Sequence, residues 1–196
     1  MGLRNLLVLA AALGLFAWPA VGGDVQPDRY TAAGGAFSIA AGDAFHQRFG
    51  AGAEARSGEI LVVDFPLLNS MGLPLQWGRT IEWVKLDKPV DPLQTDAQAS
   101  ALVDGYLEGR FGAGAFTIAD RSKFRDADGQ LVYAFSAKGN LNQVPAAWQG
   151  TVLFFDTGVA LISETDAQPA SGPFDSRNGV MNADLVGWAQ TIRPGE

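Results

Sequence analysis

The sequence predicts an α+β fold, in which a mostly antiparallel sheet of about six or seven strands has helices packed against it. Consecutive β-rich segments are joined by short turn sequences, which favours antiparallel pairing of neighbouring strands. Helical spacing of apolar residues occurs in two segments, 95–112 and 182–192. The predicted order is therefore three strands, a helix, four strands and a second helix.

The first part of the chain supplies the three early strands, which we expect at Gly35–Ala40, Glu59–Phe65 and Arg79–Asp87. Residues 41–57 are rich in Ala and Gly and are predicted to form a loop with at most one helical turn. In the third strand, the residues alternate between two faces. One face carries Ile81 and Trp83, and the other carries Thr80, Glu82, Val84 and Leu86.

The segment between the second and third strands, Pro66–Trp77, combines loop signals with apolar side chains. Pro66 and Pro74 lack an N–H and Gly72 is flexible, which predicts a loop. The apolar side chains in it are Leu67, Leu68, Met71, Leu73, Leu75 and Trp77. Such a segment either folds over the core as a lid or forms a contact surface for a partner protein or apolar ligand. The prediction favours the contact surface, because a segment between two strands lies at the end of the sheet.

The first predicted helix begins with Thr95 or Asp96 as its cap and ends at Gly112. Its apolar stripe follows the spacing i, i+3, i+4, i+7 and i+8, and consists of Ala99, Leu102, Val103, Tyr106 and Leu107. The final helix is expected to run from Asn182 to Ile192.

After the first helix, the segments 115–125 and 130–138 predict a hairpin around Asp128-Gly129, with Phe124 opposite Tyr133. A period of two places Arg121, Lys123 and Arg125 on one strand face. This stripe is either a solvated edge protected by charge against aggregation, or a contact site for an anion or an acidic partner.

The segment Gln149–Thr165 predicts the central hairpin, because Val, Leu, Phe and Ile fill both of its halves. Thr157-Gly158 is the expected turn, since glycine accepts a positive φ. One face would carry Leu153, Phe155, Ala160 and Ile162, and the other would carry Val152, Phe154, Leu161 and Ser163. Two apolar faces indicate a central pair of strands that is covered on both sides.

The N-terminus has the features of a signal peptide over residues 1–22. Arg4 precedes an apolar run, Leu6–Trp18, of about 13 residues, which is shorter than the ~20 that span a bilayer. Small residues permit cleavage after Gly22, although an uncleaved anchor is the alternative. We therefore expect a periplasmic or secreted single domain over residues 23–196, with no stable membrane anchor after cleavage of the leader.

The charge balance excludes several classes of partner. The chain has 14 basic and 21 acidic residues, a net charge of −7 and no cysteine. A general nucleic-acid binder needs positive charge to displace counterions, and electrostatic docking on anionic lipid needs it too. The absence of cysteine also removes disulfides and cysteine-linked lipids.

No catalytic, metal or cofactor residue is predicted. His46 is the only histidine, and without cysteine a tetrahedral zinc site around it would be unusual. Asp126-x-Asp128-Gly129 lacks the first and twelfth acids of a calcium loop and fits a hairpin turn. The sequence RFGAGA occurs at 48–53 and 110–115, but neither copy is followed by the Lys-Ser/Thr of a phosphate-binding loop.

The element order resembles the Mog1/PsbP-like fold, in which an early strand precedes two longer strands, a helix, a strand meander and a closing helix. Phe37-Ser38-Ile39 matches the early strand, and Trp188 to Ile192 matches the aromatic-aliphatic end of the closing helix. The Pro-x-x-Trp that often follows the first strand is missing, and Ala41-Gly42-Asp43 stands there. The resemblance implies an accessory or binding role, and no functional residue is carried over from it.

Three hypotheses follow for function. The first is a non-enzymatic, exported bacterial envelope protein that binds a partner protein or an apolar ligand. The second is a hydrolase that uses carboxylates such as Asp64, Glu82 or Glu164 for acid–base chemistry. The third is a structural subunit of an envelope assembly.

Overall fold

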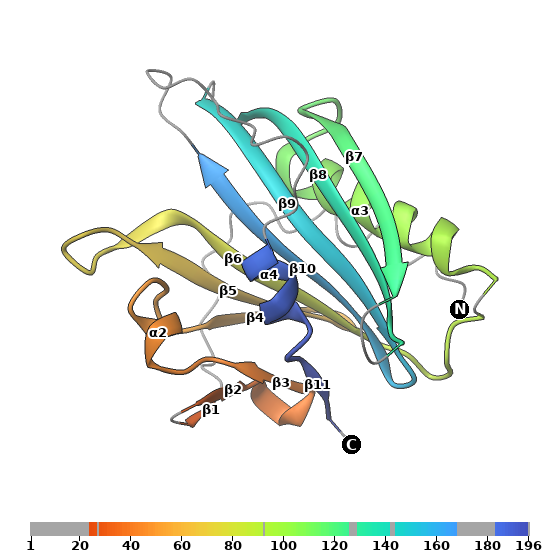
Figure 1. Cartoon of the computed structure of the whole chain (residues 1–196), viewed down its shortest axis with the longest axis horizontal. Helices are drawn as coiled ribbons and strands as arrows, with labels where there is room; N and C mark the ends of the chain where they lie inside the picture. The colour runs from red at the N-terminus through yellow and green to blue at the C-terminus, as the bar shows by residue number, and fades with distance from the viewer. Residues whose placement is uncertain are drawn as a thin grey trace.

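The computed structural model describes residues 24–26, 28–91, 93–125, 129–141, 144–167 and 183–195. Its large sheet consists of β4 (Ala53–Ser57), β5 (Ile60–Leu68), β6 (Pro74–Lys85), β7 (Phe116–Arg125), β8 (Leu131–Leu141), β9 (Val144–Phe155) and β10 (Gly158–Ala167). These seven strands pair antiparallel in the order β4-β5-β6-β10-β9-β8-β7 (Figure 1). The predicted leader, 1–22, lies outside the described residues.

A second sheet of four strands is formed by segments from the two ends of the described sequence. It contains β1 (Asp24–Gln26), β2 (Arg29–Thr31), β3 (Phe37–Ala40) and β11 (Arg193–Pro194), in the order β1-β2-β3-β11. The helical elements are η1 (Ala33–Gly35), α2 (Asp43–His46), α3 (Thr95–Phe111) and α4 (Ala183–Ala189). The α+β class with a large antiparallel sheet is confirmed, but the prediction missed β4 and most of the small sheet. None of the described helices is long and apolar enough to cross a membrane.

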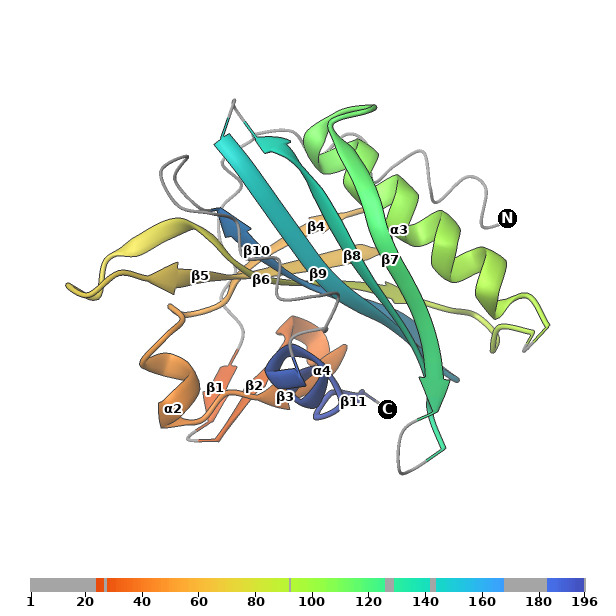
Figure 2. The same ribbon diagram turned by 45° about the horizontal axis from the view of Figure 1, so that its top comes forward.

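The large sheet is covered on both faces (Figure 2). On one face, α4 and the small sheet enclose a core that includes Phe37, Ile39, Leu185 and Trp188, together with Leu153 and Ile162 of the central hairpin. On the opposite face, α3 packs its predicted apolar stripe against Phe135, Trp148, Val152, Val159 and Leu161. The β9–β10 hairpin is thus the centre of both cores, as its two apolar faces predicted.

The turn of that hairpin differs from the prediction. Phe155 pairs with Gly158 and Leu153 pairs with Ala160, so the turn residues are Asp156 and Thr157. The two strands are shifted by two residues relative to the predicted pairing, which leaves every side chain on its predicted face. Glycine is required at position 158 because there is no room for a side chain, and not because the backbone has a positive φ. A Cβ there would lie 2.3 Å from Cζ2 of Trp83.

The β7–β8 pairing is displaced from the prediction by one residue. Phe124 lies opposite Val132, and Lys123 lies opposite Tyr133. The connection is longer than a two-residue turn, since residues 126–130 separate the two strands. A one-residue shift reverses the faces of β8 relative to β7, so Tyr133 and Phe135 lie on the same face as Arg121 and Lys123.

The segment 66–77 is not the predicted loop. β5 continues to Leu68 and β6 begins at Pro74, so only residues 69–73 connect the two strands. Pro66 is tolerated because β4 pairs with β5 only as far as Asp64 and the β5–β6 pairing has an irregularity after Pro66. Pro74 occupies the first position of its strand, where an N–H is not required.

Helix α3 matches its predicted extent and ends at Gly112, whose φ is 92°. Its predicted caps are wrong, because Gln94 precedes the helix and makes no side-chain capping bond. The hydroxyl of Thr95 lies 2.6 Å from the Tyr133 hydroxyl, and Asp96 accepts hydrogen bonds from Lys123. Both polar side chains therefore connect α3 to the sheet. The predicted cap of the last helix, Asn182, lies outside the described residues.

Candidate functional site

The end of the β5–β6 hairpin projects from the body of the molecule (Figures 1 and 2). We call residues 67–77 the β5–β6 arm. Asn69 builds its tip, because its Oδ1 accepts hydrogen bonds of 2.9 Å from the N–H groups of both Met71 and Leu73. Gly72 supplies the positive φ of 74° that the turn requires. The tip is therefore an ordered turn between two paired strands.

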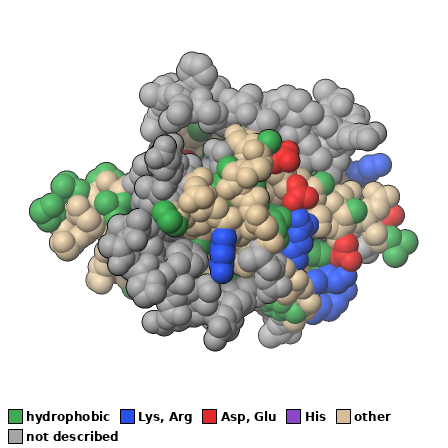
Figure 3. All heavy atoms as spheres, turned by 90° about the horizontal axis from the view of Figure 1, so that it is seen from above, with side chains coloured by type: hydrophobic (Ala, Val, Ile, Leu, Met, Phe, Trp, Pro, Cys, Tyr) green, Lys and Arg blue, Asp and Glu red, His purple; other side chains and the backbone are tan. Residues whose placement is uncertain are grey.

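The six predicted contact residues fall into two groups along the arm. Met71, Leu73 and Leu75 are 75%, 54% and 39% exposed. Leu67 and Leu68 are half-buried at the base, where Leu67 packs against the core and bridges to Phe49. The side chain of Trp77 is outside the described part of the chain. Apolar side chains gather at the projecting end of the molecule in Figure 3.

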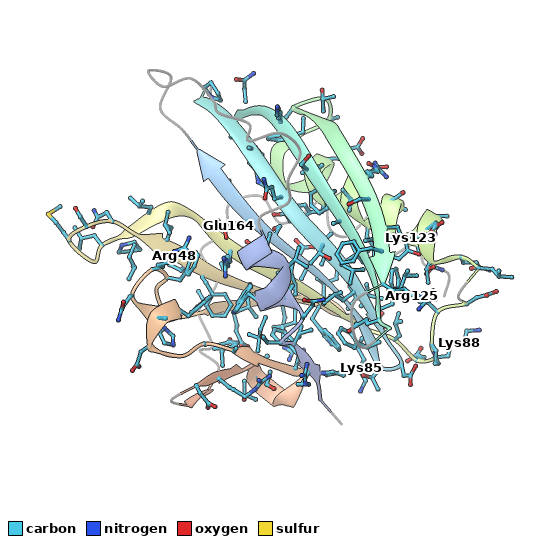
Figure 4. All side chains as sticks on the ribbon, in the orientation of Figure 1. Arg48, Lys85, Lys88, Lys123, Arg125 and Glu164 are labelled. Atoms are coloured by element: carbon cyan, nitrogen blue, oxygen red, sulfur yellow. The ribbon has the colours of Figure 1, made fainter. Side chains whose placement is uncertain are left out.

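A buried arginine fixes the base of the arm to the body. Arg79 is 2% exposed, and its Nε lies 2.7 Å from Oε2 of Glu164. Its guanidinium carbon lies 4.7 Å from the ring centroid of Phe49 and 4.8 Å from that of Trp188. Charge pairing and cation–π contact thus join the arm, the central hairpin and α4 at one point. Glu164 is labelled in Figure 4.

The carboxylates of the hydrolase hypothesis are divided by the sheet. Glu164 shares the α4 face with Arg79, whereas Asp64 and Glu82 alternate with residues of that face and lie on the opposite side. Asp64 accepts a 2.6 Å hydrogen bond from the Thr80 hydroxyl. Glu164 therefore cannot form an acid–base pair with Asp64 or Glu82.

The three basic side chains of β7 are exposed and share one face, as predicted. Lys123 and Arg125 are labelled in Figure 4. Arg121 donates a 2.6 Å hydrogen bond to Oδ1 of Asp104, and Lys123 donates bonds of 2.7 and 2.9 Å to the two carboxylate oxygens of Asp96. Arg125 donates to the carbonyl oxygen of Gly129. Two of the three positive charges are therefore paired with α3, an arrangement that the predicted register did not suggest.

A cavity of about 170 Å³ lies between α3 and the strands β7 and β8. Its floor is apolar and consists of Ala99, Val103 and Phe135, all at most 4% exposed. Arg121, Lys123 and Asp96 also line it. Sequence reasoning missed this cavity, because the predicted register placed Phe135 and Tyr133 on the face away from the basic stripe.

The charged groups at the cavity hold their ionised forms. The hydrogen bond from Lys123 lowers the pKa of the Asp96 carboxyl, and the same bond raises the pKa of Lys123. Burial raises the pKa of the Tyr133 phenol. Each shift moves the pKa away from pH 7, so Asp96 and Lys123 stay charged and Tyr133 stays uncharged. Acid–base catalysis favours a pKa near the working pH.

The other sequence motifs bring no cluster of reactive groups together within the part of the chain that the structure describes. His46 lies half-buried in α2 with its ring edge-on to Phe45. In the described ranges, no group of three or more His, Cys, Asp or Glu side chains could hold a metal ion. Both RFGAGA copies connect a helix to a strand, α2 to β4 and α3 to β7. Three residues of the Asp126–Gly129 turn, 126–128, are outside the described residues.

Comparison with known proteins gives no relative: no protein-family model and no curated protein sequence matches this chain.

Proposed function

We propose that this chain is a non-enzymatic binding module of the bacterial envelope, which contacts a partner protein through the tip of the β5–β6 arm. One observation carries the proposal. Four large apolar side chains are exposed among the described residues, and three of them, Met71, Leu73 and Leu75, are together on the arm. Clustered exposed apolar side chains commonly mark interaction sites.

The shape of the arm favours a contact surface over a lid. The tip extends beyond the body of the molecule, where it has no sheet surface to cover (Figure 1). Complete burial of the three side chains against a partner would contribute at most roughly 4–9 kcal/mol before the cost of association. Met71, the most exposed of them at 75%, is an unbranched side chain that adapts to irregular surfaces.

The envelope location rests on the sequence of residues 1–22, with its single arginine, its apolar run and its small residues before the cleavage point. The accessory role is supported by the resemblance to the Mog1/PsbP-like fold, which rests on the order of the predicted elements. Intact-mass measurement of the exported protein tests the leader. A product that begins near Gly23 is expected, and one that retains Met1 would contradict export by cleavage.

The arm is tested by site-specific photocrosslinking in the native envelope. A photoreactive amino acid at position 73 should give a discrete crosslink to protein, whereas one at position 93 should not. Leu93 is the matched control, since it is 92% exposed and lies outside the arm, just before α3. Crosslinks to lipid alone at position 73, or equal crosslinks at both positions, would contradict the proposal.

Leu73→Ser combined with Leu75→Ser separates contact from stability. Because both side chains are exposed, the free energy of unfolding should change by no more than about 0.5 kcal/mol per site. In this double variant, a photoreactive group placed at position 71 should no longer crosslink to the partner. The thermal stability should be unchanged. A melting temperature that falls by many degrees while the crosslink persists would instead make the arm part of the core.

A further inference from the structure

The cavity between α3 and β7–β8 combines an apolar floor with a charged opening, and the function proposed for the arm does not use it. We propose that it binds a small organic acid, with the carboxylate at Arg121 and an apolar body of about one ring in the floor. The two surfaces lie at opposite ends of the large sheet (Figure 1), so this inference does not depend on the arm.

The volume of the cavity limits the ligand. At about 170 Å³ it is close to the ~150 Å³ of an engineered apolar cavity that holds benzene. Drug-sized ligands occupy roughly 300–1,000 Å³. The cavity therefore suits a benzene-sized ring or a short branched chain.

The floor provides apolar contact for the body of the ligand. Ala99 of α3 is 3% exposed, and its small side chain leaves space between the helix and the sheet. Val103 and Phe135, 4% and 2% exposed, complete the apolar surface. Removing a ring from water into this space is favourable by roughly 25 cal/mol for each Å² of apolar surface.

The opening offers a negative group the remaining hydrogen-bond donors of Arg121. Arg121 and Lys123 contribute two positive charges at the opening, and each is paired with one carboxylate of α3, Asp104 and Asp96 respectively. The guanidinium of Arg121 donates one hydrogen bond, through Nη2 to Asp104, and an arginine has five N–H donors. With its side chain 39% exposed, it remains accessible to a carboxylate arriving from solvent. A cationic ligand would gain no hydrogen bond from Arg121, and a neutral carbonyl would accept a weaker bond than the bidentate pair that a carboxylate forms with a guanidinium.

The lip of the cavity is already ordered by contacts between α3 and the sheet. Lys123 is held by both oxygens of Asp96, and its Nζ lies 5.8 Å from the Tyr133 ring centroid. The Tyr133 hydroxyl is 2.6 Å from that of Thr95. Because these groups are fixed before a ligand arrives, little conformational freedom remains to be lost on binding.

The experiment titrates the purified chain with benzoate and, separately, with benzamide, the neutral analogue of nearly the same shape, and follows amide chemical shifts. Benzoate should give saturable shifts at α3, β7 and β8, and benzamide should bind at least about 10-fold more weakly. Absence of saturable shifts up to about 10 mM benzoate, or equal affinity for the two compounds, would overturn the proposal.

Three variants locate the site. Arg121→Gln should weaken benzoate binding by about 10–100-fold, the size expected for one charge-assisted hydrogen bond. Arg125→Gln is its matched control, on the same strand and face but outside the lining, and should leave the affinity within about two-fold. Ala99→Leu should fill the floor and abolish binding.

Ser100→Leu repeats the obstruction at a half-buried position of the lining, in case the more buried Ala99→Leu does not fold. Equal weakening by Arg121→Gln and Arg125→Gln would show a nonspecific charge effect and contradict the site. The arm variant Leu73→Ser with Leu75→Ser should bind benzoate normally, so failure of one proposal leaves the other measurable.

Discussion

The central hairpin permits a matched test of the two-sided core. Leu153 and Leu161 are 0% and 3% exposed, but they belong to different cores: Leu153 packs on the α4 side and Leu161 packs on the α3 side. Leu153→Ala and Leu161→Ala remove the same atoms from opposite faces of one strand pair. Any difference between them therefore reports how tightly each layer covers the sheet.

The magnitude follows from the burial of each side chain. A fully buried Leu→Ala substitution costs about 2–5 kcal/mol, with the higher values at sites where the surroundings cannot collapse into the cavity. For a chain of this length, that corresponds to a fall in melting temperature of roughly 4–20 °C. Leu93→Ala, at a position 92% exposed, should change the free energy of unfolding by less than about 0.5 kcal/mol.

Urea unfolding, followed by circular dichroism and fluorescence, measures all three variants. An unchanged slope with denaturant concentration would show that the loss comes from the native state. A cost below about 1 kcal/mol for Leu161→Ala alone would mean that α3 covers the sheet loosely. It would refute the argument that both apolar faces are fully enclosed.

Two further predictions concern glycine and charge. Gly158→Ala should destabilise the protein by about 1–3 kcal/mol, because the added Cβ would meet the buried Trp83 ring. Gly187→Ala in α4 has open space around it and should stabilise the protein by about 0.5–1 kcal/mol. Calorimetry measures both changes in the free energy of unfolding. In an NMR titration, the pKa of Asp96 should lie below 3.8 and should return toward it in Lys123→Gln. Because the folded pKa is lowered, the stabilisation is present above the unfolded pKa and is lost as pH falls through the folded value.

The central hairpin was predictable because its face pattern depends only on alternation. The turn prediction was wrong, yet a shift of two residues preserves which side chains face α3 and which face α4. The apolar stripe of α3 was predictable for the same kind of reason, since the spacing of Ala99, Val103 and Tyr106 is local. Local periodicity thus determined both layers of the core.

The candidate sites depended on non-local facts that the sequence does not display. The one-residue error between β7 and β8 moved Tyr133 and Phe135 to the wrong face, and with them the cavity. β4 and the strands of the small sheet are short segments whose pairing partners are distant, such as Arg193 with Ser38. Pro66 and Pro74 predicted a loop because sequence alone does not show where a strand loses its neighbour.

The arrangement of the sheet separates the two proposed surfaces. The arm extends from β5 and β6 on one side of β10, while the cavity lies over β7 and β8 beyond β9. Contact between the halves passes through β9 and β10, whose side chains pack into the cores on both faces of the sheet. Coupling between the two sites would require that this buried hairpin repack between two discrete arrangements. A ligand in the cavity should therefore leave crosslinking at the arm unchanged, and the two surfaces should act independently.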